Sequence, residues 1–321
     1  MIRITDRTLS CIGAAADVRD LRRFLELLIE TEPDAIELSE HLYAALAPLP
    51  GFPAYVLRIE QPDAAERYPD VSRFICRNAS PSGGERVRTE LILGAANEAY
   101  TLARFAKCRR PRVTGLDLAL SGNYTQQFAA LAEAFRDGVE FCPRDGYGLA
   151  TAAAVEWITS GAGDSVVTSF GGVGGFAPTE QVVLALRTLR LRRAGKIYAH
   201  FPEMTELFRR IAGTPPEPQK PVVGAGIFRV ESGVHVDGIA KQPKCYEPYP
   251  PEVVGLRREI VVGKNSGLSS VRIKAAELRV NCPETAAPRV LARVKRDSEK
   301  YSRALTDAEF LEIVESEANG I

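Results

Sequence analysis

The feature that most constrains the fold is an alternation of short apolar strands with amphipathic helices from residue 1 to residue 193. Strand-like runs occur at residues 1–9, 34–38, 54–59, 73–76, 113–120, 139–142 and 165–170. Helical patterns, with apolar side chains recurring every three or four residues, occur at 17–30, 85–107, 126–136, 148–160 and 179–193. This alternation predicts an α/β fold built from βαβ units around a parallel sheet.

A second region of different character follows the helical and strand-like alternation. The proline-rich run TPPEPQKP at residues 214–221 is a break at which neither a helix nor a strand continues easily. It divides the chain into a domain at residues 1–213 and a second domain at residues 214–321. In the second domain, His235 lies between Val234 and Val236 in an alternating pattern. Such a histidine is either a packed side chain or a proton-transfer residue, since imidazole titrates near neutrality.

Composition excludes several classes of function. Lysine plus arginine equals aspartate plus glutamate, so the net charge is zero and gives no reason to expect nucleic acid or an acidic membrane as a partner. The six cysteines are scattered without a CxxC pair, which argues against a disulfide framework or a zinc ribbon and favours reduced thiols. With no leader-like or membrane-length apolar run, a soluble, cytoplasmic protein is expected.

Three motifs in the second domain carry a family resemblance. They are ESGVHVDG at residues 231–238, YEPYPPEVVG at 246–255 and GKNSG at 263–267. Together they resemble the linker subdomain of homocitrate synthases and 2-isopropylmalate synthases, above all the homocitrate synthases associated with nitrogenase and hence with nitrogen fixation. The resemblance implies a transferase of the family that condenses acetyl-CoA with a 2-oxo acid on a divalent metal.

The resemblance also implies the architecture. The first domain would be a TIM-type (β/α)8 barrel, and the second a small α+β linker subdomain that mediates dimerisation. Only seven strands can be placed, and the stretch between residues 120 and 139 has room for a single helix. The sequence therefore predicts a shortened or distorted barrel, unless one strand has been missed in the middle of the chain.

In the first two family signatures, the positions of the catalytic arginine and of the metal ligands hold other residues. The first barrel strand of the family ends in a D-x-T-L-R-D run, whose catalytic arginine falls here on Ser10 and whose metal-binding aspartate falls on Cys11. The family's H-x-H pair of metal ligands falls on Cys142 and Arg144. An arginine side chain offers only hydrogen-bond donors and cannot ligate a cation.

The remaining signatures are altered as well. The ligating asparagine of N-G-x-G-E-R-A-G-N falls on Gly171, and the Glu-Arg pair of that motif falls on Gly175 and Phe176. In the linker, the histidine of G-K-H-S-G is replaced by Asn265. All four metal-ligand positions, Cys11, Cys142, Arg144 and Gly171, thus hold residues foreign to the family, and no metal ligands are predicted.

Other candidate residues follow from the same correspondence. In the family, a linker histidine and a nearby tyrosine reach into the active site of the neighbouring subunit. This implies catalytic roles in trans for His235, for Tyr246 or Tyr249, and for Glu231. The candidate substrate-binding residues are Asp6, Thr8, Ser10, Asp145, Thr168 and Asn265.

Three hypotheses follow. In the first, the chain is a catalytically degenerate pseudoenzyme without a cofactor, acting as a partner or regulatory subunit in a homodimer or in a heterodimer with an active paralogue. In the second, it is an active acyltransferase that uses acetyl-CoA and a divalent metal in a rearranged site, with Asp6, Glu37 and Asp145 around the cation. In the third, Cys11 or Cys142 is a nucleophile, which requires a lowered thiol pKa.

Overall fold

The computed structural model describes residues 1–13, 15–77, 86–106, 108–117, 120 and 122–318. The contacts divide the chain into two compact units, Met1–Val223 and Gly224–Ile321. The division therefore lies after Val223, whereas the sequence suggests a boundary after residue 213. No helix within the described ranges has both the length and the apolar character needed to cross a bilayer.

The first unit is a closed barrel of parallel strands. Each strand pairs with the next along the chain, and β8 pairs with β1 to close the ring. The strands are β1 (Arg3–Asp6), β2 (Ala35–Ser39), β3 (Ala54–Arg58), β4 (Arg73–Cys76), β5 (Val87–Leu93), β6 (Arg112–Gly115), β7 (Glu140–Pro143) and β8 (Ser165–Thr168). The expectation of a TIM-type (β/α)8 barrel is confirmed.

The barrel is complete rather than shortened, because an eighth strand lies where the sequence suggested a helix. The predicted helix at residues 85–107 contains β5 at its start and α4 (Glu98–Ala106) at its end. β5 pairs with β4 on one side and with β6 on the other. Glu90 and Leu93 of this strand are buried, so a charged side chain occupies an interior position that an apolar residue normally fills.

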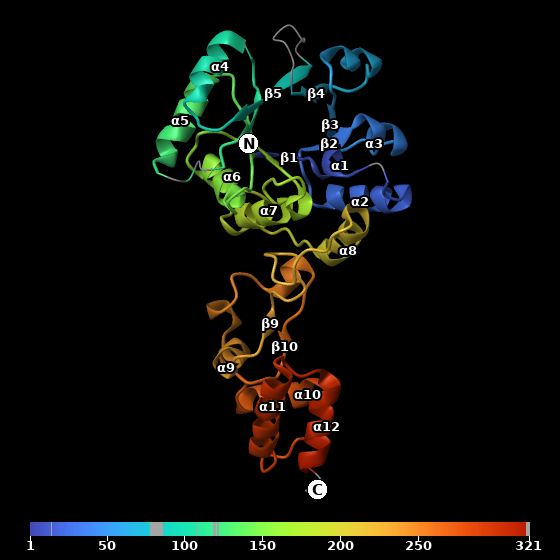
Figure 1. Ribbon diagram of the computed structural model, residues 1–321, viewed down its shortest axis with the longest axis vertical. Helices are drawn as coiled ribbons and strands as arrows, with labels where there is room; N and C mark the ends of the chain where they lie inside the picture. The colour runs from blue at the N-terminus through green and yellow to red at the C-terminus, as the bar shows by residue number, and fades with distance from the viewer. Residues whose placement is uncertain (14, 78–85, 107, 118–119, 121, 319–321) are drawn as a thin grey trace. The chain divides into compact units, whose positions relative to one another are not determined.

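Most helices of the first unit form an outer layer around this barrel (Figure 1). The helices are α2 (Val18–Glu30), α3 (Glu40–Ala45), α4, α5 (Tyr124–Ala134), α6 (Ala150–Thr159), α7 (Thr179–Thr188) and α8 (Phe201–Ala212). The one-turn helix α1 (Thr8–Cys11) instead follows β1 at the carboxyl end of the strand. The short helices η1 (Pro62–Arg67) and η2 (Phe170–Gly172) lie in loops. Aromatic side chains fill the space between helices and strands. Phe128 and Trp157, for example, meet edge to face with ring centroids 5.4 Å apart.

The second unit is a small α+β domain. Strands β9 (Arg229–Val230) and β10 (Glu259–Ile260) pair in parallel. The helices are α9 (Gly233–Lys241), α10 (Leu268–Glu277), α11 (Ala287–Tyr301) and α12 (Asp307–Ala318), with η3 (Pro243–Cys245) and η4 (Pro251–Val254) between them. Val271, Val290 and Phe310 lie in one hydrophobic core that joins α10, α11 and α12. The alternating sequence around His235 is helical, because it forms α9.

Candidate functional site

The interior of the barrel carries a network of buried ion pairs. Arg112 donates from Nε to Glu140 Oε2 at 2.9 Å and also pairs with Glu37. Arg58 donates to Glu37 Oε1 at 2.7 Å, and its two terminal nitrogens lie 2.9 and 3.0 Å from the oxygens of Glu90. Burial alone would raise the pKa of Glu37, but the surrounding arginines outweigh it and hold this pKa below its usual value.

Arg7 shares Glu37 and Glu90 with Arg58, and it also contacts a thiol and an aromatic ring. It follows β1 at the carboxyl end of the strand, the end at which TIM barrels place their active sites, and only 6 % of its surface is exposed. Its Nη1 lies 3.4 Å from Glu90 Oε1 and 3.4 Å from Cys142 Sγ, and its Nη2 lies 3.9 Å from Glu37 Oε1. The Phe176 ring covers the guanidinium, with its centroid 3.9 Å from Cζ.

Two of the four residues that the resemblance aligns with metal ligands, Cys11 and Cys142, come together here. Cys142 is fully buried in a cluster with Val167 and Phe176, and Cys11 packs against that cluster. The six cysteines all lie within the described ranges and are reduced, as the sequence suggested. Burial is the largest influence on Cys11 and raises its pKa, although Arg7 acts in the opposite direction. The nucleophile hypothesis requires a lowered thiol pKa, and Cys11 shows the opposite.

The other two ligand positions do not offer metal ligands. Arg144 is exposed, and its Cζ lies 5.9 Å from the centroid of the Phe176 ring. Gly171 has a φ of 65° and donates its amide to Glu180 Oε2 at 2.9 Å. A guanidinium cannot ligate a cation, glycine has no side chain, and thiols suit soft metals rather than Mg²⁺ or Mn²⁺. These residues therefore do not fit the hard divalent metal that the family implies.

Three of the candidate substrate-binding residues form a buried network between β1, β8 and α7. Asp6 accepts from the Thr8 amide at 2.8 Å and from the Thr179 hydroxyl, and Thr179 Oγ1 also lies 2.8 Å from Thr168 Oγ1. Thr8 in turn accepts from the amide of Phe170 at 2.6 Å. Burial is the main cause that raises the pKa of Asp6 to about 6. Asp6, Thr8 and Thr168 are fully buried. Their hydrogen bonds connect the carboxyl ends of β1 and β8.

The remaining first-unit candidates are bound to neighbouring groups. Ser10 Oγ lies 2.7 Å from Glu37 Oε1, next to the ion-pair network. Asp145 Oδ1 accepts from the amide of Ala150 at 2.9 Å and so caps the first turn of α6. The described residues contain no group of three His, Cys, Asp or Glu side chains placed to hold a metal ion.

Sequence reasoning missed several buried groups of this unit. Arg7, Arg58, Glu90, Arg112 and Glu140 were not among the candidates, although each lies within a barrel strand, at one end of it or directly after it. Glu180 was also missed. Burial raises its pKa to about 7, and its Oε1 has no hydrogen-bond partner among the described residues. Charged residues within or beside short apolar strands are the signal that could have identified the network.

The second unit brings its own candidates together. His235 on α9 and Tyr246 after η3 are both exposed, and their rings meet edge to face with centroids 5.8 Å apart. The Tyr246 ring lies against Gly238, where an added Cβ would be 2.2 Å from Tyr246 Cζ. Glu231 Oε1 accepts from the backbone amide of Asn265 at 2.9 Å, which fixes the GKNSG loop.

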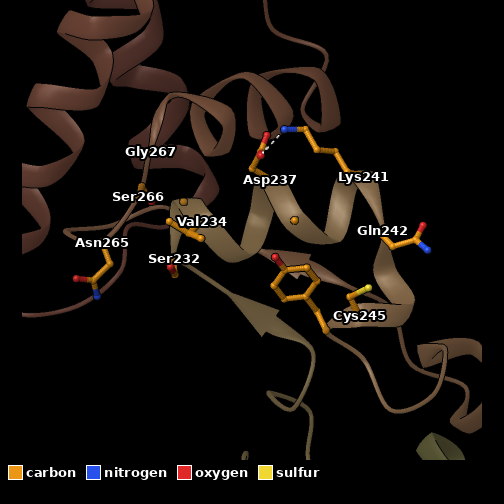
Figure 2. A pocket seen from close by; sticks show the side chains of 12 residues that line it. Ser232, Val234, Asp237, Lys241, Gln242, Cys245, Asn265, Ser266 and Gly267 are labelled. Atoms are coloured by element: carbon orange, nitrogen blue, oxygen red, sulfur yellow. Dashed lines mark hydrogen bonds and ion pairs between the residues drawn. The ribbon is translucent and has the colours of Figure 1, made fainter.

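Tyr246 also lines a pocket of about 690 Å³. Figure 2 shows this pocket from close by. Val234, Asp237 and Lys241 line it from α9, and Tyr246 and Asn265 line it from the two following loops. Asp237 and Lys241 form an ion pair at 2.6 Å, and both side chains are largely exposed. The dashed line in Figure 2 marks this pair. Tyr246 and Asn265 thus share one pocket. Tyr249, the other tyrosine candidate, packs instead against Phe228 with ring centroids 5.8 Å apart.

Comparisons with known proteins agree with this architecture. The family described as "Homocitrate synthase post-HMGL domain-like" matches residues 222–302. The homocitrate synthase omega subunit of Clostridium pasteurianum is 26 % identical over 317 residues, which cover 92 % of this chain and 89 % of that protein. The carboxyl transferase domain of Rhizobium etli pyruvate carboxylase has a similar fold, with a TM-score of 0.52 and 12 % identity over 68 % of this chain and 50 % of that one.

A further relative matches both units. The probable 2-isopropylmalate synthase of Ignicoccus hospitalis is 31 % identical over 302 residues, which cover 92 % of this chain and 73 % of that protein. This similarity extends through the barrel and through the linker motifs that carry the resemblance. The chain therefore belongs to the homocitrate synthase and 2-isopropylmalate synthase family.

Proposed function

We propose that this chain is a catalytically degenerate family member that acts as a partner or regulatory subunit of an active synthase. One observation carries the proposal: the guanidinium of Arg7 lies 3.4 Å from Cys142 Sγ, at a position where the family has a metal ligand. The condensation needs a cation that polarises the 2-oxo acid. A metal ion could bind the substrate through an open coordination position. The guanidinium of Arg7 cannot replace it in this role, because Glu37, Glu90 and Phe176 already surround it.

The linker supports a role in trans. His235 and Tyr246 are exposed and adjacent, although the barrel of the same chain has lost the residues that they would serve. An imidazole beside a phenol is suited to proton transfer at the edge of another subunit's site. Glu231 has a positioning role in this proposal, since it binds the backbone amide of Asn265 beside the pocket.

A relative supports a partnership between different chains. The Clostridium pasteurianum protein is called the omega subunit of homocitrate synthase, and this chain matches 89 % of its length. A name that designates one subunit supports a complex that contains a second kind of chain. We therefore favour a heteromeric complex with an active paralogue over a homodimer of this chain.

The first test uses the pure chain. Acetyl-CoA and 2-oxoglutarate are added with Mg²⁺ or Mn²⁺, and CoA release is followed with a thiol reagent. No release above the protein-free rate is expected. Sustained turnover with bound metal would instead establish the alternative, an active acyltransferase with acetyl-CoA and a divalent metal in a rearranged site.

The second test uses the complex. The chain is co-expressed with each synthase paralogue of its source organism, and tagged protein is captured to identify stable partners. In a complex that forms, His235→Ala in this chain should lower kcat by about 100-fold, the usual contribution of a proton-transfer residue. His41→Ala, which changes an exposed histidine of α3, is the matched control. Failure to capture any synthase chain would contradict the proposal.

A further inference from the structure

The amino-terminal end of the barrel, opposite the end at which Arg7 lies, gathers arginine residues. Arg73 is the first residue of β4, Arg88 the second residue of β5, and Arg112 the first residue of β6. Arg110 precedes β6 by two residues. These three strands are neighbours, and in a parallel barrel all strands begin at the same end. The four arginines therefore lie at one end of the barrel, on adjoining strands.

Arg88 is mostly buried at this end without an acceptor for its charge. It lies two residues before the buried Glu90 on the same strand, so its side chain also points into the barrel. Within the ranges that the structure describes, its guanidinium makes no hydrogen bond and no ion pair. Such a group is uncommon, because a buried charged donor that is left unpaired is costly.

Like charges surround this guanidinium. Burial is the main cause that lowers the pKa of Arg88 to about 10. The charges of Arg73, Arg110 and Arg112 lower this pKa further, whereas Glu140 raises it. The electrostatic surroundings of Arg88 are therefore dominated by cations.

The neighbouring guanidinium groups are also short of acceptors. Among the described residues, the side chain of Arg73 has no hydrogen-bond or ion-pair partner. Arg110 donates from Nε to the backbone carbonyl of Asp137 at 2.7 Å and forms no ion pair with a described carboxylate. Arg112 is fully buried, and its Nη2 has no hydrogen-bond partner in the described part of the chain.

The carboxylates at this end are already paired with other groups. Glu140 accepts from Arg112 at 2.9 Å and from the hydroxyl of Thr5 at 2.7 Å. Three aspartates that precede barrel strands pair with arginines outside the cluster: Asp34 with Arg192, Asp137 with Arg109 and Asp164 with Arg3. The described residues thus supply no internal counterion for the unpaired arginines.

We infer that Arg73, Arg88 and Arg110 form a binding site for a doubly charged oxyanion, the group that inorganic phosphate and phosphate monoesters share. A guanidinium presents parallel N–H donors that match the oxygens of a phosphate. A dianion offsets most of the three unpaired positive charges, and the buried charge of Arg112 adds to its attraction. The site lies at the opposite end of the barrel from Arg7, so the inference does not depend on the proposed function.

The test uses inorganic phosphate and glycerol phosphate as probes. The full chain is titrated with each probe by isothermal titration calorimetry, and its melting temperature is measured in phosphate and in chloride of equal ionic strength. Saturable binding and a rise in Tm of at least about 2 °C in phosphate are expected, since a ligand that binds the folded state stabilises it. Binding of both probes assigns recognition to the phosphate group itself, whereas binding of one assigns it to the free anion or to an ester. No saturable binding of either probe would overturn the inference.

Two variants make the result specific. Arg88→Met should weaken phosphate binding by at least about 10-fold, because a charge-assisted hydrogen bond is lost. In chloride, the same variant should melt at a higher temperature than the wild type, because an unpaired and mostly buried charge has been removed. Arg109→Met is the matched control: it removes an arginine that is 82 % exposed and already pairs with Asp137, and it should keep the wild-type affinity.

The variants also define the results that contradict the site. Equal weakening of phosphate binding in Arg88→Met and Arg109→Met would show a general effect of net charge rather than a site at Arg88. An Arg88→Met chain that unfolds in chloride would contradict the inference as well, because the guanidinium would then stabilise the fold without any anion.

Discussion

Arg112 of β6 and Glu37 of β2 form an ion pair inside the barrel, although their strands lie on opposite sides of the closed sheet. Both side chains are fully buried, and Arg112 extends the contact to Glu140 of β7. The pair therefore connects opposite walls of the barrel. A buried charge is tolerated only while its partner is present, since an uncompensated one costs several kcal/mol.

Loss of one partner should strongly destabilise the barrel. Glu37→Gln is expected to lower the free energy of unfolding by about 3–5 kcal/mol, because Arg112 and Arg58 then keep their charges with fewer acceptors. Urea unfolding followed by circular dichroism measures this. Glu203→Gln, which removes an exposed partner of Arg23, should cost at most about 1 kcal/mol. Similar losses in the two variants would show that the interior network contributes no more than a surface pair.

Stability should fall as the pH rises from acid to neutral, because of Glu180. Burial raises the pKa of this carboxyl from 4.5 to about 7 in the folded chain, so the folded state binds more protons than the unfolded state between these values. Its contribution is complete below about pH 4.5 and is lost as the pH passes through 7, with a total of about 3 kcal/mol. Urea midpoints measured from pH 5 to pH 8 should show this decline.

The amide variant isolates that carboxyl. Glu180→Gln cannot titrate, so its stability curve should be flatter than that of the wild type over the same pH range. Glu66→Gln, on the exposed face of η1, should keep the wild-type slope. An unchanged slope in Glu180→Gln would assign the pH dependence to other groups, with buried Asp6, whose pKa is raised to about 6, as the next to replace.

Gly238 should be intolerant of a methyl group. A Cβ at this position would lie 2.2 Å from Cζ and 2.3 Å from the hydroxyl oxygen of Tyr246, so Gly238→Ala must displace the ring. Alanine normally stabilises a helix by up to about 1 kcal/mol relative to glycine, but overpacking costs about 1–3 kcal/mol and should dominate. Nuclear Overhauser contacts between the His235 and Tyr246 rings should disappear. Gly195→Ala, with nothing within 4 Å of its added Cβ, should leave them intact.

Phe176 should protect the buried thiol of the barrel. Cys142 is fully buried in the cluster that includes this ring, and Phe176→Ala removes the ring from that cluster. Iodoacetamide labelling of Cys142, quantified by mass spectrometry of peptides, should become severalfold faster. Tyr147→Ala, a truncation of a ring that is 65 % exposed, is the control and should label at the wild-type rate. Equal rates in the two variants would contradict the covering role of Phe176.

Much of the fold was accessible from sequence, because periodicity reports which faces are buried. Seven strands and the linker were identified correctly in outline, but β5 was assigned to a helix. Its residues Glu90 and Leu93 are buried, and a buried glutamate breaks the apolar alternation that marks a strand. The pairing of Glu90 with Arg58 makes the position possible, and no local pattern reveals a partner 32 residues away.

The candidate site was accessible only in part. The linker motifs led to His235 and Tyr246, which the structure brings together. The altered ligand positions Cys11 and Cys142 were also named from sequence, but Arg7 was passed over as the variable residue of the first motif. Its role depends on contacts with Glu90 and Cys142, far along the chain, and hence on closure of the barrel.

The interior ion pairs also restrict how the strands can assemble. Neighbouring residues of a strand point to opposite faces, so a slip of one position would turn Arg112 and Glu140 outward, against the apolar helix layer. Each misplaced strand would then bury a charge without its counterpart. A core made only of valine and leucine would oppose such sliding far less, because apolar side chains are interchangeable. The charges therefore make the correct alignment of the strands the one arrangement in which every interior arginine faces a glutamate.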